Sequence, residues 1–507
     1  MRKLGIFVTS LFGVVLPLLF LSAFLAPSAF AACHAVAPSK SGTGDGSSWS
    51  NAVAYSSLAD SRFVRGEVYY FADGDYGTSF SLTTGLSGTK TITIKKAQSY
   101  DYGRTADGCS NDISAGWNAS TMGSGQALWH NTTSASGPFI YFGTAGGYYI
   151  INGNGRTADP AVGCGNVQSN PPASMTAAPN SPSDCGFKWD DSTCTSTATN
   201  GCDGGNGFIY GAGPGIQLLS IEIKGQGLNS KGNNSSETYG WFASGGNLTG
   251  VIIEHAYFHN MSTTDFTVVG GGWNGGKFDH NYSWGLFDGS INHGEAIQLQ
   301  GSNGTTAVNN IDHNIFRDQQ TNGDVVAVIE GTQTYNFYDN VDFCSSGGNS
   351  DSCRHNNGII GCYNSQTCAN VKVYNNTFSF PGNCGWNVTG GPSTMTVENN
   401  LWYNCASVGM AGGTNTVDYN SYLNSSQSAV GTHDVSISSG AANPFVNLAI
   451  GNVNLVSDGS NYNNRLSLAS PYSVDLYGNS FTTNRGAAQS VSSIKPAAPT
   501  NLSGSVQ

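Results

Sequence analysis

The sequence has little charge: Asp, Glu, Lys and Arg make up 10% of its 507 residues, against about 25% in an average globular protein. A disordered chain is charge-rich and poor in aromatic residues, whereas 11% of this chain is aromatic, which argues against disorder. The abundant glycine, asparagine, serine and threonine are poor helix formers, which argues against a coiled coil or a helical bundle. What remains is a large β protein with many turns.

Basic residues are scarcer than acidic ones. The chain has 20 Lys and Arg against 32 Asp and Glu, and its formal net charge is −12. Nucleic-acid binding needs clustered Lys and Arg to neutralise phosphates. We therefore expect no nucleic-acid partner.

Long apolar runs are missing beyond residues 1–31, which we predict to be a signal peptide. Arg2 and Lys3 form its charged start, an apolar stretch reaches about Leu25, and residues 29–31 (AFA) fit a cleavage site. No later stretch approaches the ~20 apolar residues of a membrane span. We expect export to the extracellular space, with the periplasm or cell surface as alternatives, and no integral membrane span after cleavage.

The cysteines lack the spacing of a zinc site. Close pairs such as Cys362 and Cys368 have no matching CxxC partner, so zinc is disfavoured. An even number, 12, in an exported chain instead predicts disulfides. Four of them fall in residues 157–207, where we predict a long insertion stapled by disulfides. Cys33, just after the predicted cleavage site, leaves a lipoprotein as the alternative.

A nine-residue pattern recurs through the second half of the chain, with apolar or acidic residues before a polar residue, usually Asn, and then apolar or aromatic residues. The units are IIEHAYFHN (252–260), KFDHNYSWG (277–285), NIDHNIFRD (310–318), NFYDNVDFC (336–344), KVYNNTFSF (372–380), TVENNLWYN (396–404) and TVDYNSYLN (416–424). Short strand-like runs, most of them ending in glycine, lie between the units. One such repeat cannot bury its own apolar face, but stacked repeats can.

The recurring asparagine has a physical use in such a stack. Its amide can hydrogen-bond the equivalent amide one coil away, and asparagine tolerates left-handed backbone. A solvent-facing polar turn is the alternative, but registered occurrences favour a ladder. The positions are Asn281, Asn314, Asn340, Asn376, Asn400 and Asn420, with Ala256 taking that place in the first unit.

The coil spacing, the asparagine positions and the segment GEVYYFADGDYGTSFSL (66–82) resemble the right-handed parallel β-helix of the pectin-lyase-like superfamily. The resemblance covers roughly residues 60–450 and implies an all-β solenoid. Lyases, hydrolases, esterases and adhesins share this fold, so the resemblance does not imply one reaction. We expect a β-helix domain over residues 32–490, with the insertion at about 157–207, and a C-terminal tail or linker over 491–507.

Charged residues gather in residues 254–330, which hold five of the nine histidines. Side chains that are neighbours in a β-helix come from matching positions of adjacent coils. One column of histidines follows a column of acids, and we interpret both as a turn ladder or a stacked imidazole row. The two columns are His255, His280 and His313, and Glu254, Asp279 and Asp312.

Glu295, in the segment HGEAIQLQG (293–301), is the main catalytic candidate. Aligning the glycines that end successive runs brings Asp265, Glu295 and Asp324 together, with His293 close by. Paired carboxylates serve glycoside hydrolysis, and a neighbouring carboxylate raises the pKa of the general acid. We predict Glu295 with Asp324 or Asp265 as the acid/base pair, oriented by His293. Alternatively, Glu295 caps a turn or pairs with Lys277.

A lyase would use other residues, and Lys277 and Arg317 are the basic side chains in the same window. Calcium could also neutralise a uronate, but the sequence has no compact calcium loop, so calcium is an option and no metal ligand is assigned. Aromatic faces stack on sugar rings. The predicted substrate-binding residues are Trp241, Trp273, Trp284, Gln298, Gln300 and Glu330.

Together these patterns favour a secreted, monomeric, polysaccharide-degrading enzyme that acts in a groove along the β-helix. A glycoside hydrolase is slightly ahead of a polysaccharide lyase. A non-catalytic adhesin or glycan-binding scaffold is the alternative, because the surface is rich in Ser, Thr, Asn and Gly.

Overall fold

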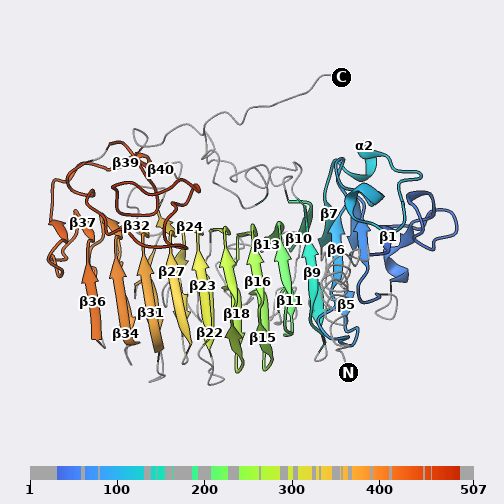
Figure 1. The fold of residues 1–507 in the computed structure, drawn as a ribbon, viewed down its shortest axis with the longest axis horizontal. Helices are drawn as coiled ribbons and strands as arrows, with labels where there is room; N and C mark the ends of the chain where they lie inside the picture. Colours follow the sequence, from blue (N-terminus) through green and yellow to red (C-terminus); the bar gives the residue numbers. More distant parts are fainter. Residues whose placement is uncertain are drawn as a thin grey trace, which may run out of the picture.

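The structure is a computed structural model in which stacked β-strands form an elongated body (Figure 1). The predicted signal peptide, apart from Ala31, and the predicted tail lie outside the described residues. The described residues are 31–58, 63–77, 80–130, 139–143, 146–154, 164, 185–191, 207–225, 239–261, 264–285, 295–300, 307–321, 327–329, 333–344, 354–355, 358–362, 368–388, 392–409, 414–448, 452–457 and 459–490.

Three long sheets carry most of the strands. Sheet 1 has 13 strands in the order β2 (Val53–Ala54), β1 (Cys33–Ala37), β3 (Val68–Phe71), β6 (Ile92–Lys96), β9 (Tyr149–Asn152), β12 (Gln217–Leu219), β16 (Ile252–Glu254), β20 (Lys277–Asp279), β23 (Val308–Asp312), β27 (Thr334–Tyr338), β31 (Cys368–Tyr374), β34 (Pro392–Glu398) and β36 (Thr414–Asp418). Sheet 2 has 12 strands in the order β38 (Val435–Ile437), β37 (Ser421–Leu423), β35 (Leu401–Tyr403), β32 (Thr377–Ser379), β28 (Val341–Phe343), β24 (Ile315–Arg317), β21 (Tyr282–Trp284), β17 (Tyr257–His259), β13 (Ile221–Lys224), β10 (Phe187–Asp190), β7 (Ala127–His130) and β4 (Gly74–Gly77). Sheet 3 has 9 strands in the order β33 (Trp386–Val388), β30 (Ile360–Cys362), β26 (Ala327–Ile329), β22 (Ile297–Gln300), β18 (Thr264–Val269), β14 (Tyr239–Ser244), β11 (Ile209–Tyr210), β8 (Ile140–Phe142) and β5 (Phe80–Leu82).

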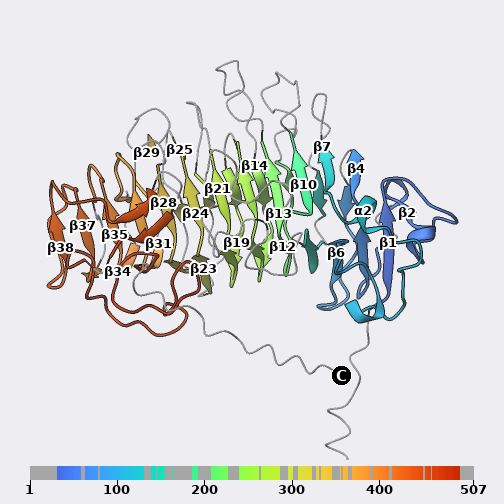
Figure 2. The same ribbon diagram turned by 90° about the horizontal axis from the view of Figure 1, so that it is seen from above.

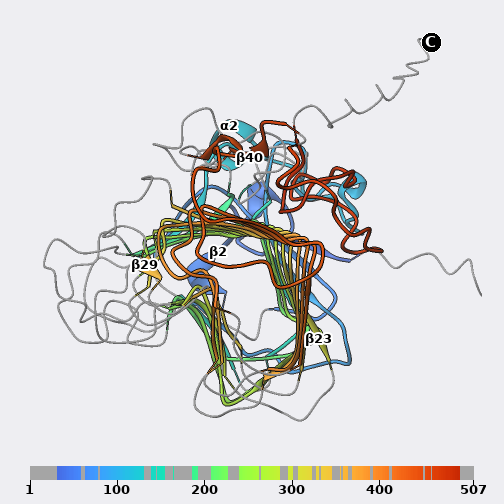
Figure 3. The ribbon, with the colours of Figure 1, turned by 90° about the vertical axis from the view of Figure 1, so that its left-hand side faces the viewer.

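The chain visits the three sheets in turn, as in β16, β17 and β18, and then returns to sheet 1 at β20. Each strand pairs in parallel with its counterpart one coil later. Crossovers between parallel strands are right-handed in about 98% of cases. The view along the axis shows the coils superposed around one interior (Figure 3). The predicted right-handed parallel β-helix is confirmed.

Short elements complete the described structure. They are the parallel pairs β15 (Asn247–Thr249) with β19 (Gly272–Asn274) and β25 (Gln320–Thr321) with β29 (Arg354–His355), the antiparallel pair β39 (Phe445–Asn447) and β40 (Asn452–Leu455), the helix α2 (Ala119–Met122), and the 3-10 turns η1 (Trp49–Asn51), η2 (Tyr55–Ser57) and η4 (Thr105–Asp107). No helix among the described residues is long and apolar enough to cross a membrane.

The interior is built from the apolar side chains on the inward face of each strand, because successive side chains of a strand point to opposite faces. Sheet 1 shows this most regularly, since its middle residues stack in register and are fully buried. They are Leu218, Ile253, Phe278, Ile311, Phe337, Val373 and Val397. Stacking of this kind gives the core that no single coil could form alone.

The predicted asparagine ladder is confirmed at the corner between sheets 1 and 2. Each side chain points inward and is almost fully buried. From Asn281 to Asn400, each backbone N–H donates to the Oδ1 of the next asparagine at 2.9 to 3.0 Å. The left-handed backbone, however, falls on the residue before each asparagine, and before Ala256 in the first unit. These residues are His255, His280, His313, Asp339, Asn375, Asn399 and Tyr419.

Disulfides fasten the segments outside the coils. Cys33 pairs with Cys109 near the first coils, and Cys384 pairs with Cys405 near the last. Within residues 157–207, Cys164 pairs with Cys185, which confirms that a disulfide staples the predicted insertion.

Added segments cover the two ends of sheet 2, as Figure 2 shows, with α2 at one end and the C-terminal strands at the other. The C-terminal segment (residues 459–490) packs Leu476 and Ala487 into an apolar cluster with outward side chains of sheet 2, such as Val341 and Leu401. The middle of the β-helix therefore lies between two covered ends.

Candidate functional site

Three carboxyl groups stand in one outward column at the end of sheet 1. Glu254 is in register with Asp279, and Asp279 is in register with Asp312, one coil later each time. Neighbouring parallel strands lie about 4.8 Å apart, so like charges in this column repel each other. We call Glu254, Lys277, Asp279, His280, Asp312 and His313 the corner cluster.

Lys277 supplies the positive charge of the corner cluster. It lies two residues before Asp279 on the same face of β20, and its ammonium group contacts Asp279 Oδ2. Burial works against that charge, but Asp279 and Asp312 outweigh it, and the pKa of Lys277 is raised. The side chain of Lys277 is 36% exposed and covers Asp279, which is 1% exposed.

The three carboxyl groups differ in their proton affinities. Burial opposes ionisation of Asp279, but the hydrogen bond from His280 and the charges of His280 and Lys277 lower its pKa. Burial and the charge of Asp279 raise the pKa of Asp312, and burial also raises the pKa of Glu254. One ionised carboxylate therefore lies between two carboxyl groups that hold their protons more tightly.

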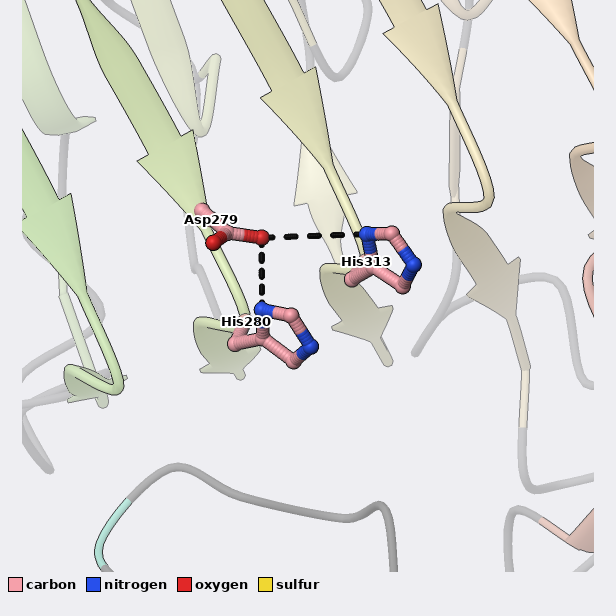
Figure 4. Close-up of side chains that lie close together, drawn as sticks. All are labelled: Asp279, His280 and His313. Carbon is pink, nitrogen blue, oxygen red and sulfur yellow. Dashed lines mark ion pairs between the residues drawn. The ribbon is translucent and has the colours of Figure 1, made fainter. Parts of the chain in front are cut away.

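The histidines form the predicted imidazole row, of which Figure 4 shows the stacked pair His280 and His313. The rings of His280 and His313 are 4.6 Å apart and inclined by 7°, and those of His255 and His280 are 5.1 Å apart. His280 Nδ1 lies 2.6 Å from Asp279 Oδ1, and His313 Nδ1 lies 3.7 Å from the same oxygen. The row thus directs ring nitrogens at the central carboxylate.

Asp279, His280 and His313 are close enough to be considered as metal ligands, since their donor atoms lie within 4.8 Å of one another. A metal ion binds in the plane of each imidazole ring, at about 2.0–2.1 Å for zinc. Two nearly parallel, stacked rings have no common plane in which one ion could lie. The geometry therefore fits a hydrogen-bonded network and does not fit a metal centre.

Asp265 and Glu295 lie on adjacent coils, but both are 0% exposed. The N–H of Asp265 donates to Ala296 O at 3.1 Å, so the register differs by one residue from the predicted pairing of Asp265 with Glu295. Asp265 accepts a hydrogen bond from Ser283, which points inward from sheet 2, and burial raises the pKa of Asp265 to about 7. A substrate has no access to either side chain as described. His293, Asp324 and Glu330 lie outside the described residues.

The predicted sugar platforms fall in two different places. Trp241 and Trp273 are buried in the core, where no sugar ring can stack on them, so the structure does not support that role. Trp284 is half-buried on the outer face of sheet 2, near His259. On sheet 3, Gln298 is buried and Gln300 is half-buried.

Arg317 differs from its predicted role as well. Its guanidinium group pairs with Asp318 at 3.0 Å and approaches the hydroxyl of Tyr282 at 3.5 Å. The side chain is 7% exposed, so it does not offer its charge to a uronate.

A second polar cluster, on sheet 2, was not predicted. The buried carboxylate of Glu222 accepts hydrogen bonds from Gln126 Nε2 at 3.0 Å and pairs with Lys188 Nζ at 3.0 Å and His259 Nε2 at 3.1 Å. Gln126 also donates to Cys185 O at 2.8 Å. This satisfied network ties the stapled insertion to the coils. Lys188 and Glu222 fall outside the recurring units, so the pattern gave no signal for them.

The corner cluster was visible in the sequence as a column of acids two places before the asparagines, but it was interpreted as structural. Its neighbour Tyr338 continues that column, in register with Asp312. Tyr472 contacts Tyr338 from a segment distant in sequence, for which no periodic signal exists.

Fold and site together define a parallel β-helix with a column of three carboxyl groups of different pKa at one corner. No protein-family model matches the chain, and no curated protein matches it. Solved structures similar to it include pectate lyase Pel9A, at 13% identity over 91% of this chain and 97% of that one, with a TM-score of 0.49. A rhamnogalacturonan lyase is similar at 10% identity over 77% and 87%, with a TM-score of 0.38. The GH136 lacto-N-biosidase from Eubacterium ramulus is similar at 9% identity over 76% and 67%, with a TM-score of 0.32. Similarities this low say nothing about substrate or reaction.

Proposed function

We propose that the protein is a secreted carbohydrate-active enzyme that hydrolyses a polysaccharide at the corner cluster. The observation that carries this proposal is the register of Glu254, Asp279 and Asp312 on adjacent coils, with the pKa of Asp279 lowered and those of its two neighbours raised. Glycoside hydrolysis uses such a pair, one carboxyl group as acid and the other as base or nucleophile. The disulfides agree with export, because they persist in oxidising compartments.

Each residue of the cluster has a role in this proposal. Glu254, whose side chain is 32% exposed, protonates the leaving oxygen, and Asp279 acts as base or nucleophile. Lys277 turns outward to uncover Asp279 when the sugar binds, and His280 orients Asp279 through its hydrogen bond. Neighbouring coils place the two carboxyl groups roughly 5 Å apart, which is the separation of retaining glycosidases.

Elimination by a lyase is the second candidate, with Lys277 as the base. The raised pKa of Lys277 argues against it, because a protonated ammonium group cannot take a proton near neutral pH. A non-catalytic scaffold would gain nothing from three crowded carboxyl groups, whose repulsion lowers stability.

The test is a panel of neutral and acidic polysaccharides incubated with the mature protein, with and without a chelator. Hydrolysis releases reducing sugar with no absorbance from unsaturated products, whereas elimination produces that absorbance. Glu254→Gln and Asp279→Asn should each lower kcat on a cleaved substrate by about 100-fold or more.

Glu398→Gln is the matched control, because Glu398 stands in the same column, beyond Tyr338 and Tyr374. It should leave the rate unchanged. Full activity in Asp279→Asn contradicts the proposed site, and glycan binding without cleavage supports the scaffold instead.

A further inference from the structure

The C-terminal segment crosses the corner between sheets 1 and 2 directly beyond the corner cluster (Figures 1 and 3). Leu466 N donates to Asn399 Oδ1 at 2.7 Å, and Asn399 Nδ2 donates back to Leu466 O at 2.9 Å. Asn375 Nδ2 donates to Tyr472 O at 3.1 Å. Asn375 and Asn399, the left-handed residues that follow β31 and β34, thus hold the segment by hydrogen bonds to its backbone.

The ring of Tyr472 closes the acid column at this end. It lies 4.9 Å from the ring of Tyr338, at 90°, and 4.8 Å from the ring of Tyr374, at 72°. Tyr338 is the next residue of the column after Asp312, and Tyr338 and Tyr374 are 3% and 8% exposed. No sugar ring can therefore lie on the column beyond Asp312.

On the opposite side of the corner cluster, the described strands of sheet 1 continue as an outward-facing strip. The column continues from Glu254 to Leu219 and Asn152, and the parallel column continues from Ile252 to Gln217 and Ile150. All of these side chains are half-buried, and the five other than Glu254 are uncharged. Three coil steps, about 14 Å, separate Glu254 from Lys95, which pairs with Asp101.

We propose that the enzyme binds the end of an uncharged polysaccharide, with the chain lying on this outward-facing strip and its end held against Tyr472. This inference rests on the proposed hydrolysis at the corner cluster. The strip offers apolar surface and amide groups, which suit the C–H face and the hydroxyl groups of a neutral sugar. Between Lys277, which adjoins Ile252, and Lys95, the described residues of the strip offer no cation, so a uronate lying on the strip itself finds no countercharge.

The closed end also determines the product. Cleavage at Glu254 and Asp279 leaves only the space before Tyr472 for the released part. The products should therefore be mono- or disaccharides cut one at a time from a chain end. Tyr472 is a positioning residue in this account, since its ring blocks the surface and takes no part in proton transfer.

The experiment compares viscosity with reducing ends during digestion of a neutral polysaccharide by the full mature chain. Chain-end attack raises reducing ends while viscosity stays high, and a cyclised form of the same glycan is not cleaved. Tyr472→Ala should open the column, so that longer products and a faster fall in viscosity appear. Tyr472→Phe, which keeps the ring, and Thr483→Ala, at an exposed position of the same segment, should keep the wild-type products.

An early fall in viscosity with the wild-type protein, or unchanged products from folded Tyr472→Ala, overturns this inference and leaves the proposed hydrolysis standing. Cleavage of polyuronates alone also overturns it. Absence of any cleavage by the wild type overturns both proposals. If Tyr472→Ala does not fold, the wild-type pattern and the cyclised glycan still decide.

Discussion

Two columns of polar side chains run along the same corner of the β-helix, one inside and one outside. The inner column is the asparagine ladder, whose members donate and accept in turn from coil to coil. The outer column holds Glu254, Asp279 and Asp312 at the same once-per-coil spacing. The first repeats a neutral group, and the second repeats an acid.

The difference lies in what each group can exchange with its copy one coil away. An amide carries both donor and acceptor, so a stack of amides satisfies itself even in a dry interior. A carboxylate only accepts, so a stack of carboxylates needs protons, a lysine or histidines between its members. The ladder therefore stabilises the fold, whereas the acid column lowers its stability, as expected if the column serves the proposed catalysis.

The largest effect is expected from breaking the ladder at its centre with Asn340→Ala. This change leaves the N–H of Asn314 and the carbonyl of Ile311 buried without their partner, and it also removes contacts with Asn376. Each buried unsatisfied group costs about 1–3 kcal/mol, so the free energy of unfolding should fall by about 5 kcal/mol. Denaturant unfolding followed by fluorescence measures it.

Asn415→Ala, at an exposed position of β36, is the control for this prediction and should cost little. A loss below 1 kcal/mol in Asn340→Ala would mean that the ladder is not a main source of stability.

The next effect concerns Asp265, a carboxyl group buried in the interior, where the ladder uses neutral amides instead. Its raised pKa, about 7, means that its contribution to stability is present below about pH 4 and is lost as the pH rises through 7. Three pKa units correspond to about 4 kcal/mol. Asp265→Asn should gain that amount over the wild type at pH 8 and little at pH 4.

Denaturant midpoints at the two pH values check this prediction, with the exposed Asp45→Asn as control. Activity should persist in Asp265→Asn. If activity is lost and the pH dependence is unchanged, Asp265 is the catalytic group that the sequence suggested.

The smallest effect is expected for the countercharge of the acid column. Lys277→Met removes the ammonium group from Asp279, and a half-exposed ion pair is worth about 1 kcal/mol or less. In a double-mutant cycle, adding Asp279→Asn to Lys277→Met should restore most of the stability that Lys277→Met alone removes. Lys372→Met, in register with Lys277 three coils later, should show no coupling to Asp279.

The features that repeat once per coil were predictable from the sequence. The β-helix, the asparagine ladder and the imidazole row all follow from spacing, because stacked coils place equivalent residues in contact. The predicted pairing of Asp265 with Glu295 is different, because it depends on aligning nearby glycines, and the register in the structure differs by one residue. Trp273 is among the predicted substrate-binding residues, but apolar packing buries it.

Contacts between the coils and the segments added to them had no comparable signal. Tyr472 belongs to the C-terminal segment and meets Tyr338 through packing that spacing does not encode. Lys188 lies on β10 in register with Glu222, but neither residue falls in a recurring unit. Such contacts come from one-time packing between distant parts of the chain. Periodicity therefore predicts the β-helix but not the contact of Tyr472 with the acid column.

The last rung of the ladder has a consequence for assembly. Asn420 N donates to Asp434 Oδ1 at 2.7 Å, and the other oxygen of Asp434 accepts from Val430 N and Gly431 N at 3.0 and 2.8 Å. Unlike the asparagines, this carboxylate has no N–H to offer to a further coil. The end of a stack of coils presents unpaired strand edges, and such edges can pair with another copy of the chain and form a fibre. Asp434 therefore ends the chain of side-chain donors and acceptors, so the ladder itself offers no donor to a further copy.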